Sequence, residues 1–454
     1  MIGDSAIGAG VRRLSDDTLV VFVSDTHIGG ADGTEIFDSA ADLTALMTEI
    51  GRHNGPVELV LLGDILDLER MGPAGQVNDH VTETLRRPDY ADLFDAVRAF
   101  RGPAGHRVTY VVGNHDAELW WNVRLQQVLT GAGLVDEFAL SYTAGFQTLG
   151  DQLIHGEHGN QFDPTNRFTD YGDPLDTPIG THVVDQVVRP IGSGARISGN
   201  LDLREVSFVF PLSAIPTWIA GRIFYRFLGD ALRWIVVLFV IANVVHVMLI
   251  WIGSSDVQQA TRTVLGEVAC DIGVLLLVCA VVFVVGRRTA RRAISLVTLR
   301  LADAASGSEP ARIRDALLAD EPLPLPGSPA PQRVAVFVSG HTHAPSSTHL
   351  RRDDDTMTAV VNTGCWLRQL HPVTARLGAP EVFVPEFVQT HVRVQRSPDG
   401  AVVELWSHPR PARGTLPWIE RAAITGRMPK QEDGPATPRL LDRQLVRSRT
   451  EASA

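Results

Sequence analysis

The chain has 454 residues and a formal net charge of −11 at pH 7. This length exceeds what a single hydrophobic core usually needs, so two or three domains are expected. The negative charge argues against a general nucleic-acid binder, which would need a basic face. Three cysteines do not make a disulfide framework, which favours a reducing, cytoplasmic setting.

The first part of the chain alternates short apolar runs with helical patterns. Residues 1–17 are mostly small and polar, and they predict a flexible tail. Apolar residues recur at helical spacing within about Glu35–Arg52, and a second helix is predicted at about Tyr90–Phe100.

Five apolar, strand-like runs each end at a turn that carries Asp, Asn or His beside a glycine or serine. The runs are Leu19–Val23, Val57–Leu62, Val108–Val112, Leu153-Ile154 and Val334–Val338, and the turns are Ser24-Asp25-Thr26-His27, Gly63-Asp64, Gly113-Asn114-His115-Asp116, His155-Gly156-Glu157-His158 and Ser339-Gly340-His341-Thr342-His343. One such turn is commonplace, because turns favour Asp and Asn. Five at the strand ends where α/β sheets bind ligands predict a metal site.

Oxygen and imidazole ligands without a thiolate favour Mn²⁺, with Fe or Zn²⁺ as alternatives. His115 is a candidate general acid, because the ordinary pKa of histidine lies near neutral pH. Asp116 either fixes the tautomer of His115 or is a structural loop residue.

Three nearby polar residues have two readings each. Asp67 either caps a helix or contacts substrate. Glu157 and His158 are expected as polar loop residues, with contact to substrate as the alternative.

The ordered set of turns resembles the calcineurin-like metallophosphoesterase superfamily, over residues 18–160 and about 332–408, the two parts of the expected catalytic domain. Asn362-Thr363-Gly364 is similar to the segment after that family's last histidine block. The resemblance implies a four-layer α/β/β/α sandwich and a phosphoester hydrolase with a dinuclear metal site and a bridging hydroxide. One metal would be held by Asp25, His27, Asp64 and His343, and the other by Asp64, Asn114, His155 and His341. The resemblance also places His115 near the leaving-group oxygen, oriented by Asp116.

Residues 161–309 form an insertion between the fourth and fifth turns. Residues 234–252 are long enough to cross a hydrocarbon core of about 30 Å, and residues 268–286 are marginally so. The loop between them carries one arginine, whereas both outer flanks are rich in arginine, so the positive-inside rule predicts a transmembrane hairpin with cytoplasmic flanks. Residues 211–229 have the pattern of an interfacial amphipathic helix. The alternative for the hairpin is a pair of helices buried in a soluble core.

After the last turn, Phe387–Val394 and Ala401–Trp406 predict strands that complete a second sheet, and residues 409–454 predict a polar tail. The sequence therefore predicts a multi-pass protein of the cytoplasmic membrane whose catalytic domain faces the cytoplasm. Its partners would be the lipid bilayer and a phosphorylated substrate, with no nucleic acid.

The leading substrate class is a lipid-linked or amphipathic phosphodiester, pyrophosphate or monoester. The first two turns are similar to the branch that contains UDP-2,3-diacylglucosamine pyrophosphatases, but the chain departs from it at His115 and in the insertion. Two alternatives remain: a tethered phosphatase or cyclic-nucleotide phosphodiesterase that acts on a soluble substrate, and a membrane scaffold with a decayed site.

Overall fold

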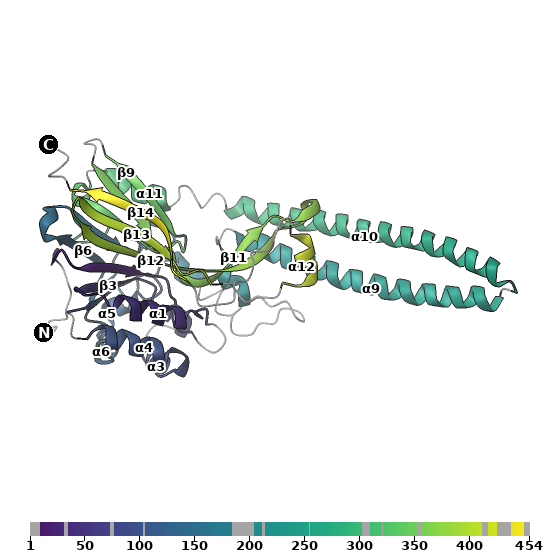
Figure 1. Cartoon of the computed structure of the whole chain (residues 1–454), viewed down its shortest axis with the longest axis horizontal. Helices are drawn as coiled ribbons and strands as arrows, with labels where there is room; N and C mark the ends of the chain where they lie inside the picture. Colours follow the sequence, from purple (N-terminus) through teal and green to yellow (C-terminus); the bar gives the residue numbers. More distant parts are fainter. Residues whose placement is uncertain are drawn as a thin grey trace.

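The computed structural model describes residues 10–30, 35–72, 77–102, 105–183, 204–210, 214–253, 255–301, 309–319, 321–352, 356–410, 416–424 and 437–448. These residues form two mixed β-sheets packed face to face, with helices on the outer faces and a long helical hairpin that projects from one end (Figure 1).

The first sheet has eight strands in the order β14-β13-β12-β2-β3-β4-β5, with β11 paired to β12 beyond this path. Its parallel part is β2 (Leu19–Val23), β3 (Val57–Leu62), β4 (Arg107–Val111) and β5 (Glu137–Ala139), and its antiparallel part is β11 (Trp366–Val373), β12 (Val382–Ser397), β13 (Gly400–Ser407) and β14 (Arg439–Arg447). The helices of the first half are α1 (Ala40–Ile50), α2 (Leu68–Met71), α3 (Val77–Leu85), α4 (Pro88–Phe100), α5 (Glu118–Trp121) and α6 (Val123–Gly131).

The second sheet has six strands in the order β1-β6-β7-β8-β10-β9. They are β1 (Arg12–Leu14), β6 (Ser141–Phe146), β7 (Leu153–Glu157), β8 (Val334–Ser339), β9 (Ser346–Arg351) and β10 (Met357–Asn362). Helix α11 (Glu309–Leu318) packs on its outer face through Ile313 and Leu317. The remaining short elements are α7 (Ile179–Val183), α12 (Trp418–Ala423), and 3-10 turns at Gln147–Leu149, Asn160–Phe162, Arg204–Phe208, Pro331–Arg333 and Arg376–Gly378.

Alternating side chains of the strands build the two cores. Val21 and Val23 of β2 face helices α1 and α4, whereas Val20 and Phe22 face the other sheet. This period of two is the property of extended backbone that lets one strand serve two layers. The predicted sandwich of two facing sheets with helices on the outer faces is therefore confirmed.

Two expectations about the ends of the chain, and one about the sheet that β12 and β13 join, were wrong. Arg12–Leu14, inside the expected N-terminal tail, forms β1 and pairs in parallel with β6. The expected C-terminal tail contains α12 and β14, the outermost strand on β13. Both strands are rich in arginine, and charged residues are typical of edge strands. A prediction that relies on apolar runs therefore does not detect them. Strands β12 and β13 extend the first sheet rather than the second, because β12 pairs antiparallel with β2.

The insertion forms two long antiparallel helices, α9 (Ile215–Gly253) and α10 (Val257–Leu301), that reach away from the sandwich (Figure 1). The expected amphipathic helix at 211–229 and the apolar segment at 234–252 are one continuous helix from Ile215 onward; residues 211–213 lie outside the described part. The most apolar windows of both helices have no buried residues, so the buried-core alternative is wrong.

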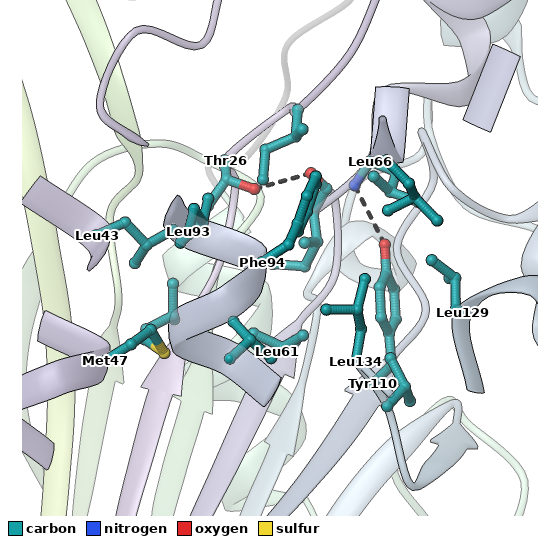
Figure 2. A pocket seen from close by; sticks show the side chains of 16 residues that line it. Thr26, Leu43, Met47, Leu61, Leu66, Leu93, Phe94, Tyr110, Leu129 and Leu134 are labelled. Atoms are coloured by element: carbon teal, nitrogen blue, oxygen red, sulfur yellow. Dashed lines mark hydrogen bonds between the residues drawn. The ribbon is translucent and has the colours of Figure 1, made fainter. Parts of the chain in front are cut away.

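A small apolar cavity of about 60 Å³ lies between the first sheet and helices α1 and α4 (Figure 2). Two polar groups at its rim hold the loops above it. Thr26 donates from its hydroxyl to the carbonyl of Ile65 (2.8 Å), and the Leu66 amide donates to the hydroxyl of Tyr110 (3.1 Å). These two hydrogen bonds hold the loops that follow β2 and β3 in place over the core.

Candidate metal centre

The predicted ligands follow strands of both sheets. Strands β2, β3 and β4 are parallel neighbours, so the turns that follow them lie along one edge of the first sheet. The turn after β8 joins them from the facing sheet, where the His341 amide donates to Asp25 Oδ2 (3.1 Å). Within the first sheet, the amides of Asp25 and His27 donate to the carbonyls of Gly63 and Asp64. Backbone hydrogen bonds therefore fix these turns to one another.

Five predicted ligands have the left-handed backbone conformation that non-glycine residues rarely adopt. Their φ angles are 53° for Asp25, 49° for His27, 54° for Asp64, 64° for His341 and 59° for His343. Among the described residues only one other non-glycine residue, Leu377, has a positive φ. Such conformations cost about 1–3 kcal/mol each and concentrate at functional sites. The fold accepts this strain where the ligand-type side chains converge.

The glycines of the turns leave room for these side chains. A Cβ at Gly113 would lie 2.3 Å from Asp64 Oδ1, and one at Gly340 would lie 2.5 Å from Asp25 Oδ2. These glycines are required by close approach to a carboxylate and not by chain flexibility.

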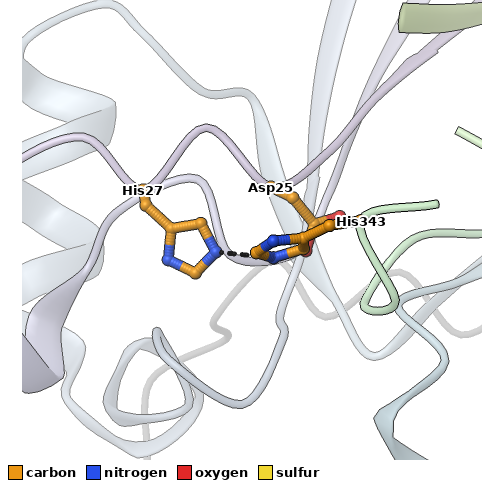
Figure 3. Close-up of side chains that lie close together, drawn as sticks. All are labelled: Asp25, His27 and His343. Atoms are coloured by element: carbon orange, nitrogen blue, oxygen red, sulfur yellow. Dashed lines mark hydrogen bonds and ion pairs between the residues drawn. The ribbon is translucent and has the colours of Figure 1, made fainter. Parts of the chain in front are cut away.

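The side chains form two groups that meet at Asp64. In the first group, His343 Nε2 lies 3.2 Å from both Asp25 Oδ1 and His27 Nε2 (Figure 3). In the second group, the ligand-type atoms of Asp64, His158 and His341 lie within 4.8 Å of one another. Asp64 Oδ2 also lies 3.8 Å from His27 Nε2, which places this carboxylate between the groups.

The donor set fits two divalent cations. Asn114 Oδ1 is buried without a hydrogen-bond partner in the described part of the chain, whereas buried Asp25 Oδ1 and His158 Nε2 have only ligand-type neighbours, His343 and Asp64. Burying such polar atoms is costly without further partners, and a bound cation would supply them. Imidazole, carboxylate and amide oxygen suit a borderline or hard divalent metal.

His155, predicted as a ligand, lies elsewhere. Its Nδ1 is 2.9 Å from the Thr143 hydroxyl, and its ring contacts Phe337 with ring centroids 5.9 Å apart. His158 occupies the expected position instead, with its Nε2 3.2 Å from Asp64 Oδ2. The phase of β7 explains the correction, because Gly156 faces the other sheet, toward Phe22, so that residues 155 and 157 face the opposite side.

Asp116 does not contact His115. Its carboxylate accepts from the amides of Ile65 and Gly113 and from the Tyr110 hydroxyl, and it therefore braces two loops. The residue that orients His115 is Asp67, whose Oδ1 lies 3.1 Å from His115 Nδ1. The prediction that Asp116 orients His115 was wrong.

Residues 18–190 match the family of calcineurin-like phosphoesterases. The chain contains a calcineurin-like phosphoesterase domain. Such a domain makes the protein a phosphoester hydrolase, and the structure adds to the matched segment the turn with His341 and His343, which lies far beyond residue 190 in the sequence. No curated protein matches the chain.

Asp67 is the carboxylate that interacts with His115, the candidate general acid of the phosphoesterase site. It is fully buried, caps α2 through the Arg70 amide, and also lies 3.2 Å from His27 Nδ1. Burial alone would raise the pKa of Asp67, but the charges of His115 and Arg70 outweigh it and lower the pKa. The same pairing acts on His115: burial favours its neutral form, yet Asp67, Glu69 and Asp64 raise its pKa well above the ordinary value. These carboxylates therefore favour the protonated form of His115.

Asp116 shows the opposite behaviour. Burial and the neighbouring charge of Asp64 raise its pKa to about 7, and the hydrogen bonds from Tyr110 and Gly113 only partly oppose this. The raised pKa and the three hydrogen bonds of Asp116 fit a structural role in holding the two loops together, and not a role as the partner of protonated His115.

Sequence reasoning missed one further contact. His341 Nε2 lies 3.1 Å from Asp163 Oδ2, just beyond β7, and this pair orients the ring of His341. Burial would raise the pKa of Asp163, but hydrogen bonds from His341, Thr165 and Asn166 lower it. The Asn362 side chain donates to the Gly340 carbonyl (2.5 Å) and so fixes the His341 turn.

Proposed function

We propose that this protein is a metal-dependent hydrolase that acts at a membrane surface on a lipid-linked or amphipathic phosphodiester, pyrophosphate or phosphomonoester. The observation that carries the hydrolase assignment is the convergence of buried Asp and His side chains, on backbone of positive φ, inside a phosphoesterase domain.

Two divalent cations would use the two groups of ligands. The residues of the first group are Asp25, His27, Asp64 and His343, and those of the second are Asp64, Asn114, His158 and His341. When bound, the cations supply positive charge to the phosphoryl oxygens and lower the pKa of water. Mn²⁺ is the favoured ion, with Fe or Zn²⁺ as alternatives.

The chain's own residues supply position and a proton. His115, whose protonated form is favoured by the nearby Asp67 carboxylate, can donate a proton to the leaving-group oxygen. Glu69 Oε2, 3.5 Å from His115 Nδ1, adds to the negative field that keeps this proton in place. Rigid turns hold the remaining groups, as suits phosphoryl transfer, in which positioning and charge stabilisation dominate.

The hairpin supports the membrane part of the proposal. Leu238, Ile241, Leu276 and Leu277 are between 56% and 65% exposed along α9 and α10. A soluble monomer rarely exposes so large a continuous apolar surface. The arginine-rich inner ends of both helices favour an orientation in which the phosphoesterase domain faces the cytoplasm.

The test uses the full chain purified in detergent and reconstituted in vesicles. Aryl phosphodiester and monoester substrates are assayed with and without Mn²⁺, beside the Asp64→Asn variant, and metal content is measured for each. We expect turnover that requires metal and is lost in the variant, with higher rates on lipid-linked substrates in vesicles. Metal-dependent activity that is indifferent to lipid would instead assign a soluble substrate, and a protein that binds no metal would overturn the hydrolase proposal.

A further inference from the structure

The inner end of the helical hairpin is surrounded by apolar side chains that are open to solvent. Leu377, in the turn between β11 and β12, is 78% exposed, and Trp418, at the start of α12, is 62% exposed. On the neighbouring helix α9, Ile223 and Phe227 are 52% and 57% exposed. A single exposed apolar residue is ordinary, but a group of them at one level of the molecule indicates a contact surface.

These residues belong to one packed unit. Beneath them lies a buried cluster made by α9, α10, the β11–β12 ribbon and α12; its members are Phe224, Tyr225, Leu228, Ala290, Ala375, Val382, Leu416, Ile419 and Ile424. The Tyr225 hydroxyl donates to the Pro380 carbonyl (2.6 Å), and Ala375 forms a β-bridge with Ile424. The ribbon turn and α12 are therefore fixed to the helices (Figure 1).

One hydrogen bond fixes the position of the β11–β12 turn along helix α10. Arg287 is the first charged residue after the apolar stretch Ile272–Gly286 of α10. Its Nη1 donates to the carbonyl oxygen of Leu377 (2.6 Å). Leu377 therefore lies at the level at which the apolar surface of α10 ends, which is the level of the headgroups if the hairpin spans a bilayer.

The charges at this level complement a lipid surface. Arg288, Arg376 and Arg421 are exposed on α10, the ribbon turn and α12. Arginine beside tryptophan and leucine is the composition of protein segments that lie in the headgroup region, where phosphate attracts the guanidinium and the apolar side chains reach the acyl boundary.

We propose that the β11–β12 turn and α12 form a membrane collar, in which Leu377 and Trp418 enter the headgroup layer and Arg288, Arg376 and Arg421 contact lipid phosphates. The proposal rests on the membrane insertion stated under the proposed function. A lipid surface is the occupant because the Arg287 hydrogen bond holds Leu377 at the end of the apolar stretch of α10, and exposed arginines accompany the exposed apolar side chains at that level. The collar fixes the phosphoesterase domain against the bilayer, in addition to the hairpin.

The experiment measures depth with a fluorophore at single sites. Cys270 and Cys279 are replaced by alanine, while Cys365 is fully buried and remains. Leu377→Cys and Trp418→Cys are then labelled with an environment-sensitive probe and placed in vesicles of phosphatidylcholine and phosphatidylglycerol. Lipids that carry a nitroxide on the headgroup or deep in the acyl chain act as quenchers.

Two matched control positions define the scale. Ile241→Cys reports the middle of the hairpin, and Val123→Cys reports an exposed apolar site, 50% exposed, on the phosphoesterase domain. We expect the collar probes to be quenched mainly by the headgroup nitroxide, Ile241→Cys by the deep nitroxide, and Val123→Cys by neither. Collar probes as unquenched as Val123→Cys, with Ile241→Cys quenched, would overturn the collar and leave the membrane anchor standing. An unquenched Ile241→Cys would overturn both.

Discussion

Replacing Asp67 by asparagine tests whether Asp67 supports His115 as the general acid. The substitution keeps the size of the side chain but removes the charge that lies 3.1 Å from His115 Nδ1. A hydrogen bond to a charged group contributes about 1.5–3 kcal/mol, and its loss in the transition state corresponds to about 10- to 150-fold in rate. We expect a loss of this size for a substrate whose leaving group is an alkoxide, because that group needs a proton.

The leaving group and the pH profile separate this role from a structural one. A nitrophenolate leaves without a proton, so we expect the Asp67→Asn rate on an aryl substrate to fall by much less. Asp67 raises the pKa of His115, so its removal lowers that pKa. Activity needs protonated His115, and the basic limb of the pH–rate profile therefore moves to lower pH.

Metal content is measured in parallel, because Asp67 also contacts His27. Asp116→Asn is the control: it lowers stability and leaves the leaving-group dependence unchanged, since Asp116 does not contact His115. Equal losses of Asp67→Asn activity on both leaving groups, at normal metal content, would refute the reasoning.

Three further changes follow from the geometry. His158→Ala should bind about one fewer metal ion per chain by elemental analysis, whereas His155→Ala should keep both and lose about 1–3 kcal/mol of stability in a denaturant titration; the reverse pattern would contradict the assignment. Chelation of the metals should lower the thermal midpoint, because an ion at 100 times its Kd stabilises the native state by about 2.7 kcal/mol; an unchanged midpoint would argue against the site. Trp218→Ala removes a fully buried side chain that packs α9 on Leu370 and Phe383, and should cost about 3–5 kcal/mol without changing metal content. Faster proteolysis near the base of α9 would report that loss, and a rate equal to that of the parent protein would contradict it.

Much of the site could be predicted from sequence, because ligand-type residues directly follow apolar strands. Asp25, Asp64 and His341 each come one small residue, a serine or a glycine, after the end of a strand, so the residue type and the strand end together indicate the metal edge. The structure brings these three residues together with His27 and His343. Asn114 also lies buried after β4, with its amide oxygen unpartnered among the described residues.

The prediction of His155 as a ligand in the fourth turn was wrong because β7 extends beyond its apolar residues. Leu153 and Ile154 looked like the whole strand, which made His155 the first residue of the turn. In fact β7 runs to Glu157, and Ile154, Gly156 and His158 share the phase that faces the first sheet. The alternation of apolar, small and polar residues at these three positions was the available signal.

Sequence alone could not separate a site role of Asp67 from helix capping, and in the structure the same carboxylate both caps α2 and contacts two histidines. The carboxylate accepts from the Arg70 amide at the start of α2 and, with its remaining lone pairs, holds two histidines from different turns. A capping pattern therefore does not exclude a role in catalysis. What decides is the side chain's complete burial beside two imidazoles, which depends on how three separate turns pack.

Strand β11 connects the two proposals in one geometric argument. At one end the Trp366 amide is hydrogen bonded to the Asp25 carbonyl, and at the other end the strand leads into the turn that Arg287 holds. Eight residues of strand extend at most about 25 Å, and Figure 1 shows β11 running from the sandwich toward the base of the hairpin. Because β11 is extended along its whole length, we expect the phosphoesterase site to stand off the headgroups by a distance of this order if the collar rests on the bilayer. We therefore expect lipids with an extended headgroup to be better substrates than those whose phosphate lies at the acyl boundary. A short-headgroup phosphomonoester lipid that is hydrolysed in intact vesicles as fast as a long-headgroup substrate would contradict this geometry.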